Sequence, residues 1–323
     1  MKLNAWAQRR ERSNLTLLRV MAWLSLRFGR PAGRFVLHMI AAYFLLVSPS
    51  VRRASHRYLR RALRRPATWR DLYRHVFTFA STVHDRIYLL NDRFDLFDIR
   101  VRGETLVNDA LAGGRGAFLI GAHLGSFEAI RAIGRTQPDL RVAVTMYEDN
   151  ARNINAILAA VNPDAKPDVI SLGHVDAMLK VHEALESNTM VGILADRSLL
   201  RASGASTRSM PFLGAPAAFP LGPLHMAAML KRPVIFMTAL HHDDNRYDIH
   251  FERLADFTDV PRERRASEVQ AALARYVALV EQHCVAAPYN WFNFFDFWQD
   301  ADAHRHEETP RVRTVVPRET SDA

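Results

Sequence analysis

The 323-residue sequence predicts an α/β protein with a mostly parallel central sheet flanked by helices, preceded by a helical, basic N-terminal segment. From about residue 110, short apolar runs rich in β-branched residues alternate with helical patterns, as in parallel sheets. Residues 1–70 hold 16 Lys and Arg against one acid, net +15, whereas the rest holds 27 against 33, net −6. A single cysteine excludes a disulfide scaffold, and 49% hydrophobic residues exclude a disordered chain.

The N-terminal segment combines apolar helices with arginine. Apolar stretches at 14–28 and 35–47 are separated by Gly29, Pro31 and Gly33, and residues 51–70 then carry eight arginines. No uninterrupted apolar run reaches the roughly 18 residues of an ordinary membrane-spanning helix, so we expect none. We expect residues 1–70 to bind a membrane surface, where arginine meets anionic headgroups. The alternatives are a solvated helix face and a nucleic-acid surface, but no nucleic-acid-binding signature accompanies the charge.

The body of the chain reads as strands alternating with helices. We expect strands at 117–121, 141–146, 168–172, 189–194 and 233–240, and an alternating, edge-type strand at 246–251. Helical patterns cover 175–185, 221–230 and 266–285, the last with Ser267 and Gln270 as a capping box. We divide the chain into a membrane-associating segment (1–100), an α/β core (101–300) and a charged tail (301–323).

Residues 121–128, GAHLGSFE, carry the densest chemical signal. They follow a predicted strand, and active sites of α/β sheets gather at the carboxyl ends of strands. His123 is a candidate general base because its unperturbed pKa lies near neutrality. Glu128, five residues later, is a candidate to orient it. A chance pairing without a catalytic role is the alternative, since the chain has 14 histidines.

Other reactive residues have structural interpretations. Ser126 lacks a Gly-x-Ser-x-Gly elbow and is read as a helix N-cap. Cys284 is read as a core residue, and the polar run 241–244 as a loop rather than a metal site. Neither a His-Glu-x-x-His motif nor a cysteine cluster predicts zinc. The aromatic run 289–298 is read as a packed end of the core, or else as the lining of an acyl-chain pocket or a membrane contact.

The 121–128 block resembles the His-x4-acid motif of the lysophospholipid acyltransferase superfamily. More narrowly, the chain resembles the bacterial lipid A biosynthesis acyltransferases of the lauroyl/myristoyl type. The likeness extends over roughly residues 15–300, through the segments 74–90, 194–197, 210–223 and 231–235. The shared order of these segments is more specific than the His-x4-acid block alone.

The resemblance implies transfer of a fatty acyl group from acyl-carrier protein or acyl-CoA to a hydroxyl or amine of a membrane-associated lipid or glycolipid. It implies His123 as base, Glu128 as its partner, and Asp196 as a third acid near the site. Gly125 and Ser126 are expected to contact substrate through backbone N–H groups near 125–127, with Arg197 as a second oxyanion donor. No cofactor, metal or nucleic acid is expected. The expected location is the cytoplasmic face of the bacterial inner membrane, peripheral or shallowly inserted.

The sequence departs from the family pattern where cations would bind the acceptor. Residues 146–150 read MYEDN where the family usually offers Tyr-Arg-Pro, and 161–166 hold Lys166 alone as a cation. Fewer cations disfavour a diphosphorylated acceptor such as lipid A. Two other classes of function stay open: a thioesterase or lipase, which would need no acceptor, and a non-catalytic membrane-surface binding protein.

Overall fold

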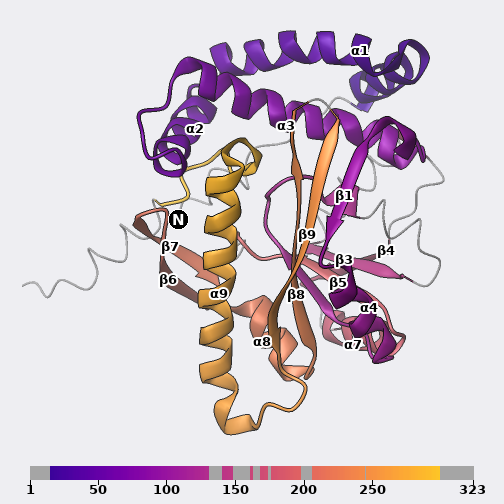
Figure 1. Cartoon of the computed structure of the whole chain (residues 1–323), viewed down its shortest axis with the longest axis vertical. Coiled ribbons are helices and arrows are strands. Elements are labelled where there is room, and N and C mark those ends of the chain that lie inside the picture. Colours follow the sequence, from indigo (N-terminus) through magenta and orange to yellow (C-terminus); the bar gives the residue numbers. More distant parts are fainter. Residues whose placement is uncertain are drawn as a thin grey trace, which may run out of the picture.

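The computed structural model describes residues 15–130, 140–147, 161–162, 168–173, 176–197, 206–243 and 245–298. Predictions that concern residues 148–150, 163–166, 175, 244 and the tail from 301 lie outside these ranges. The α/β fold class is confirmed, because a seven-stranded, mostly parallel sheet is flanked by helices (Figure 1).

The sheet places β2 (Phe118–Gly121) at its centre. The strand order is β1-β9-β8-β2-β5-β3-β4, formed with β1 (Asp98–Arg102), β3 (Val142–Tyr147), β4 (Asp168–Leu172), β5 (Met190–Leu194), β8 (Pro233–His241) and β9 (Arg246–Asp256). All neighbours pair in parallel except β8 and β9, which are antiparallel. A separate antiparallel hairpin joins β6 (Thr207–Phe212) and β7 (Ala215–Pro220).

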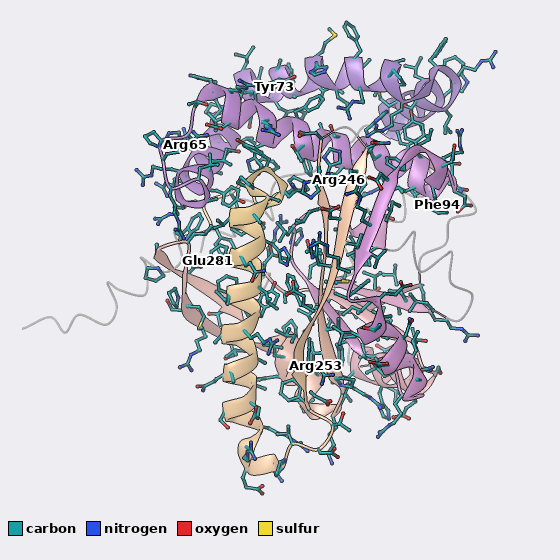
Figure 2. The ribbon with its side chains drawn as sticks, viewed as in Figure 1. Arg65, Tyr73, Phe94, Arg246, Arg253 and Glu281 are labelled. Carbon is teal, nitrogen blue, oxygen red and sulfur yellow. The ribbon has the colours of Figure 1, made fainter. Side chains whose placement is uncertain are left out.

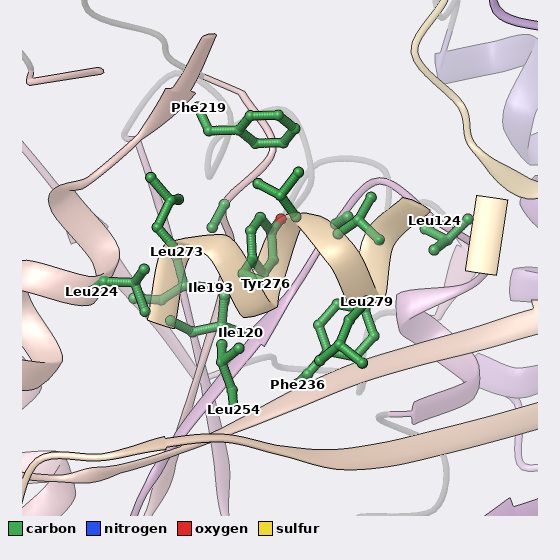
Figure 3. Packing of buried hydrophobic residues seen from close by; sticks show 14 of the residues in the cluster. Ile120, Leu124, Ile193, Phe219, Leu224, Phe236, Leu254, Leu273, Tyr276 and Leu279 are labelled. Carbon is green, nitrogen blue, oxygen red and sulfur yellow. The ribbon is translucent and has the colours of Figure 1, made fainter. Parts of the chain in front are cut away.

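The central strands are buried along their whole length because helices cover both faces of the sheet. All four residues of β2 are buried, as parallel strands with two covered faces require. On one face, the long helix α9 (Arg265–Ala286) packs Tyr276 among Ile120, Ile193 and Phe236 (Figure 3). On the other face, α4 (Glu104–Ala112) contributes to a second apolar cluster. Helices α7 (Ala177–Glu186) and α8 (Gly222–Met229) follow β4 and β7 along the chain.

Three N-terminal helices lie along one end of the sheet. They are α1 (Leu15–Val47), α2 (Pro49–Ala62) and α3 (Trp69–Leu90), and α1 packs against α3 (Figure 1). Non-helical dihedral angles at Gly29 (φ 81°) break α1, and Pro31 then lies in the first turn of the following helical stretch, where proline is tolerated. A capping box begins α3, with the Thr68 hydroxyl accepting from the Asp71 amide.

Two predictions about strands and helix ends are wrong in detail. The strand predicted to form an edge, β9, is second from the edge, because the unpredicted β1 pairs with it. The β1 sequence DIRVR carries three charges in five residues, so no apolar run revealed this strand. The proposed boundary between the membrane-associating segment and the α/β core, after residue 100, falls within β1. Helix α9 begins at Arg265, and the Ser267 hydroxyl donates to the Arg264 carbonyl instead of capping the helix.

The sequence predicts no membrane-spanning helix, but one described helical segment has the length and composition of one. The segment Met21–Val47 is long and apolar enough to cross a membrane, with a mean hydropathy of 1.2 in its best window, although the break at Gly29 divides it into two helical stretches. The search for an uninterrupted apolar run did not find this segment, because arginines at 27, 30 and 34 divide it. Only 28% of that window is buried against the rest of the protein, so most of this surface is exposed.

Candidate active site

His123 and Asp196 meet because their strands are neighbours. Strands β2 and β5 pair in parallel, with Gly121 opposite Leu194 at their carboxyl ends. Each residue lies two positions beyond the end of its strand, so the pairing brings both to the same edge of the sheet. The distance between His123 Nδ1 and Asp196 Oδ1 is 2.7 Å.

Asp196 is completely buried and surrounded by donors. Its Oδ1 accepts from His123, while its Oδ2 accepts from Asn293 Nδ2 at 2.8 Å and from the Trp291 indole at 3.2 Å. A buried carboxylate would be costly without such partners. These bonds fix its orientation toward His123, whose side chain is 30% exposed and therefore accessible from outside.

The electrostatics of the pair favour a neutral histidine beside an ionised acid. Burial lowers the pKa of His123, and the nearby Arg197 cation lowers it further, outweighing the opposite effect of Asp196. Burial alone would raise the pKa of the Asp196 carboxyl. The His123 imidazole, the Arg197 cation and the Asn293 hydrogen bond outweigh it and hold that pKa well below its usual range. Near pH 7 the pair is thus a neutral imidazole hydrogen-bonded to a carboxylate.

The turn that holds His123 is anchored by the backbone on both sides. Gly125 has a φ of 76°, and a Cβ there would lie 1.9 Å from the Ala239 carbonyl oxygen. The Gly125 N–H donates to the Asn290 carbonyl and the Ser126 N–H donates to the Ala239 carbonyl. Both amides are therefore engaged within the protein, which does not support their predicted donation to a substrate oxyanion. The Ser126 hydroxyl accepts from the Ala129 amide, as expected of an N-cap.

Glu128 contacts Arg86 of α3. It is buried in the first turn of the helix that follows the His123 turn, with its Oε1 3.6 Å from Arg86 Nε of α3. Among the described residues, the side-chain hydrogen bond of His123 goes to Asp196 and none goes to Glu128. The contact between Glu128 and Arg86 joins the His123 turn to the N-terminal helix α3.

Arg197 borders the pair through the C-terminal aromatic segment. Its Nε donates to Asn293 Oδ1 at 2.6 Å and its Nη2 donates to the Phe292 carbonyl at 3.0 Å. The guanidinium lies 5.5 Å from the centre of the Phe295 ring. Arg197 is thereby held next to His123, as its effect on the histidine pKa also indicates.

The aromatic run after η3 (Pro288–Asn290) proves to be part of the site as well as of the core. Trp291, Phe297 and Trp298 are buried, which agrees with the core interpretation. The run also reaches His123 directly, since the Phe292 amide donates to the His123 carbonyl. Sequence reasoning missed Asn293 and the Trp291 indole as partners of Asp196. The one available signal was a pair of asparagines, at 290 and 293, within an otherwise aromatic run.

Helix α3 contacts the aromatic segment through His75, which hydrogen-bonds to the Trp291 carbonyl. The pKa of the buried His75 is lowered to about 4, chiefly by burial, so its imidazole is neutral near pH 7. Its Nε2 donates to the Trp291 carbonyl at 2.8 Å, and its Nδ1 accepts from the Ser55 hydroxyl of α2 at 3.0 Å. Two N-terminal helices thus position the backbone of a residue that holds Asp196.

The remaining sequence candidates have structural places. Cys284 is buried in α9, where burial raises the pKa of its thiol well above the usual value. The loop interpretation of 241–244 is wrong at His241, which is the last residue of β8 and pairs with Tyr247. His242 and Asp243 follow outside the strands, as a loop requires, and His242 contacts Asp248 of β9 at 3.1 Å.

Comparisons with known proteins point to one family. The family model described as bacterial lipid A biosynthesis acyltransferase matches residues 6–300, which is most of the chain. No curated protein matches the sequence.

Proposed function

The chain belongs to the bacterial lipid A biosynthesis acyltransferase family, an acyltransferase family acting on lipid acceptors, and on that basis we propose how this enzyme works. It transfers a fatty acyl group from acyl-carrier protein or acyl-CoA to a hydroxyl or amine of a membrane-associated lipid or glycolipid. His123 is the general base. The observation that carries the proposal is the 2.7 Å hydrogen bond from His123 to the buried Asp196.

That hydrogen bond selects the tautomer of His123. An ionised carboxylate only accepts hydrogen bonds, so Nδ1 carries the ring proton and the lone pair resides on Nε2. This is the division of labour of a Ser-His-Asp triad, in which the acid orients the imidazole and stabilises the imidazolium. We therefore assign the orienting role to Asp196. Glu128, which the resemblance made the partner of His123, acts here as a support of the turn.

The reaction needs no enzyme nucleophile. The acceptor oxygen or nitrogen attacks the thioester carbonyl carbon while its proton moves to His123 Nε2. The tetrahedral intermediate collapses with cleavage of the carbon–sulfur bond, and the imidazolium returns the proton to the departing thiolate. Because the pKa of a thiol is about 8.5, the thiolate leaves with little help from a general acid. The Arg197 cation, held beside His123, stabilises the negative charge on the carbonyl oxygen.

The exposed face of α1 suits a lipid-bound acceptor. Nine large apolar side chains of α1 are exposed: Trp23, Leu26, Phe28, Phe35, Met39, Tyr43, Phe44, Leu46 and Val47. Figure 2 shows α1 at the outer edge of the molecule, with side chains on its outer side. Arginine-rich α2 follows at once. An apolar face beside cations is typical of a surface that binds anionic membranes. We propose that residues 1–70 contact the cytoplasmic face of the inner membrane and that an acidic carrier protein approaches the arginines.

Substitutions of His123, Asp196 and Glu128 test the roles assigned to these residues. His123→Ala should abolish acyl transfer, and Asp196→Asn should lower kcat by about 10³–10⁴-fold, because an amide no longer selects the Nδ1–H tautomer. Glu128→Gln preserves size and should cost far less. Turnover is measured with an acyl-thioester donor and lipid extracts as acceptor.

The outcomes separate the proposal from its rivals. If Glu128→Gln is as damaging as His123→Ala while Asp196→Asn is active, the roles assigned here are reversed. Full turnover by His123→Ala would remove the general base from the mechanism. Release of free fatty acid at a rate that no acceptor increases would identify a thioesterase.

A further inference from the structure

A second cluster of histidine and carboxylate side chains lies apart from His123. His250 and Glu252 are two residues apart on β9, so their side chains share one face of that strand. Helix α9 contacts β9 and brings His283 to the same place. In the described part of the chain these three form a group whose potential ligand atoms all lie within 4.8 Å of one another.

The cluster is held by packing. His283 is 4% exposed, and its ring stacks on Phe236 of β8 with 5.7 Å between ring centres and 12° between planes. Phe236 is the partner of Glu252 in the β8–β9 register. The rings of His250 and His283 lie 4.9 Å apart, and His283 Nε2 is 2.6 Å from Glu252 Oε1. Three secondary-structure elements therefore fix the relative positions of the side chains.

We propose that His250, Glu252 and His283 bind one divalent transition-metal ion of the Zn²⁺ type, with water as the fourth ligand. Two imidazoles and a carboxylate are nitrogen and oxygen donors that such an ion prefers. With bonds of about 2.0–2.2 Å, tetrahedral ligand atoms lie about 3.3 Å apart. The ligand atoms of the cluster lie within 4.8 Å of one another, so side-chain movements of about an ångström bring them to that spacing. Water can complete the site because His250 and Glu252 are only partly buried.

Metal binding requires the His283 ring proton to leave Nε2. The His283–Glu252 hydrogen bond breaks, the ring proton moves from Nε2 to Nδ1 through exchange with solvent, and the ion takes Nε2 and Oε1 as ligands. Glu252 is 32% exposed, which leaves its carboxylate room to move from the present 2.6 Å contact to the separation of about 3.3 Å that two ligand atoms need.

Neighbouring charges set the expected strength. Arg102 on β1 lies opposite His250 in the strand register, and its charge opposes a cation. Asp248, two residues before His250, favours a cation but is engaged with His242 and Arg246. No thiolate contributes. We therefore expect weaker binding than in sites with cysteine ligands.

The ion would join α9 to the sheet next to the catalytic turn. Opposite His250 in β8 stands Thr238, whose hydroxyl donates to the Leu124 carbonyl, one residue from His123. The metal thus acts as a structural link between β9 and α9, and the proposed acyl transfer uses none of its chemistry.

Titration of the full-length, chelator-treated protein tests the site. Zn²⁺ is added in competition with a chromophoric chelator, and Co²⁺ is added separately to follow its visible absorption bands. We expect one equivalent to bind wild type, and His250→Ala and Glu252→Gln to weaken that binding by about 10–100-fold or more, since even outer-shell changes reach this size. His250→Ala leaves the His283–Glu252 contact in place and should fold.

A matched control uses His182 of α7, an exposed histidine 3.9 Å from Glu186. His182→Ala should bind Zn²⁺ as wild type does, and zinc should raise the thermal midpoint of wild type and of this control but not of His250→Ala. The proposal is overturned if wild type binds no stoichiometric ion. It is equally overturned if His250→Ala and Glu252→Gln bind as tightly as wild type, because the ions then bind to other histidines of the chain.

Discussion

At the scale of single residues, the site rests on one buried carboxylate that serves several donors at once. Asp196 accepts from His123, Asn293 and Trp291 while remaining fully buried. Low dielectric strengthens each of these bonds and makes the loss of any one expensive. The neutral, oriented imidazole that results is the state that a general base needs before substrate arrives.

The pH dependence of the reaction follows from the environment of His123. A lowered pKa keeps the base neutral to lower pH, so the acid limb of kcat/KM should lie below the usual histidine value of about 6.5. Arg197→Gln removes a cation that disfavours the imidazolium and should move this limb to higher pH. The measurement is a pH–rate profile. Arg93→Gln, at an exposed ion pair with Asp95, is the control and should leave the limb unchanged. This account is contradicted if the acid limb of Arg197→Gln stays at the wild-type pH or moves to lower pH.

At the scale of elements, the junction between α1, α3 and β9 depends on a buried ion pair. Arg30 of α1 makes two hydrogen bonds to Asp85 of α3, at 2.8 and 3.1 Å, and the Tyr247 hydroxyl of β9 donates to the same carboxylate. Arg30 and Asp85 are buried. Removing one partner therefore leaves a charge without compensation in the interior.

The single substitution Arg30→Leu should lower the free energy of unfolding by about 3–5 kcal/mol, measured by denaturant unfolding in detergent. The double substitution Arg30→Leu/Asp85→Leu should recover part of that loss, because no unpaired charge remains. Arg93→Leu at the exposed pair should change stability far less, because solvent screens that pair. Equal effects of Arg30→Leu and Arg93→Leu would show that the buried pair has no special weight.

What the sequence could predict also differs from element to element. The central strands were predictable because parallel strands with two covered faces are continuously apolar. Strand β1 was not, since DIRVR lies at the edge of the sheet and alternates charged with apolar residues. His123 stood out by its place after a strand, and Asp196 only through the family resemblance. Asn293 and Trp291 could not be found, because no local pattern tells which side chains a distant carboxylate will contact.

At the scale of the whole molecule, the large exposed apolar side chains are concentrated in the N-terminal helices, above all in α1. Helix α1 lies at one end of the molecule (Figure 1). The N-terminal helices also contact the candidate site, because His75 of α3 donates to the Trp291 carbonyl. A membrane bound at α1 would therefore bring lipid to the side of the molecule on which His123 lies.

Membrane binding should depend on the outer face of α1. Phe35→Asp combined with Met39→Asp places two charges on side chains that are 70% and 65% exposed, so the fold should tolerate them. We expect co-sedimentation with anionic lipid vesicles to fall at least tenfold, since each buried apolar side chain contributes about 1.5–3 kcal/mol. Leu179→Asp, at an exposed position on α7, is the control and should sediment as wild type does. Unchanged sedimentation of the double variant would exclude this face as the membrane contact.

The position of the Asp196 donors along the chain has a consequence for biosynthesis. Every strand of the sheet precedes residue 257, whereas the two side chains that secure the carboxylate are at 291 and 293. During synthesis the N-terminal parts of a chain fold first. The ribosome therefore delivers the scaffold well before it delivers the residues that orient the base. Under the proposed roles, a nascent chain without residues 291–293 contains His123 but lacks the two side chains that hold Asp196, so we expect acyl transfer only after the aromatic segment has docked.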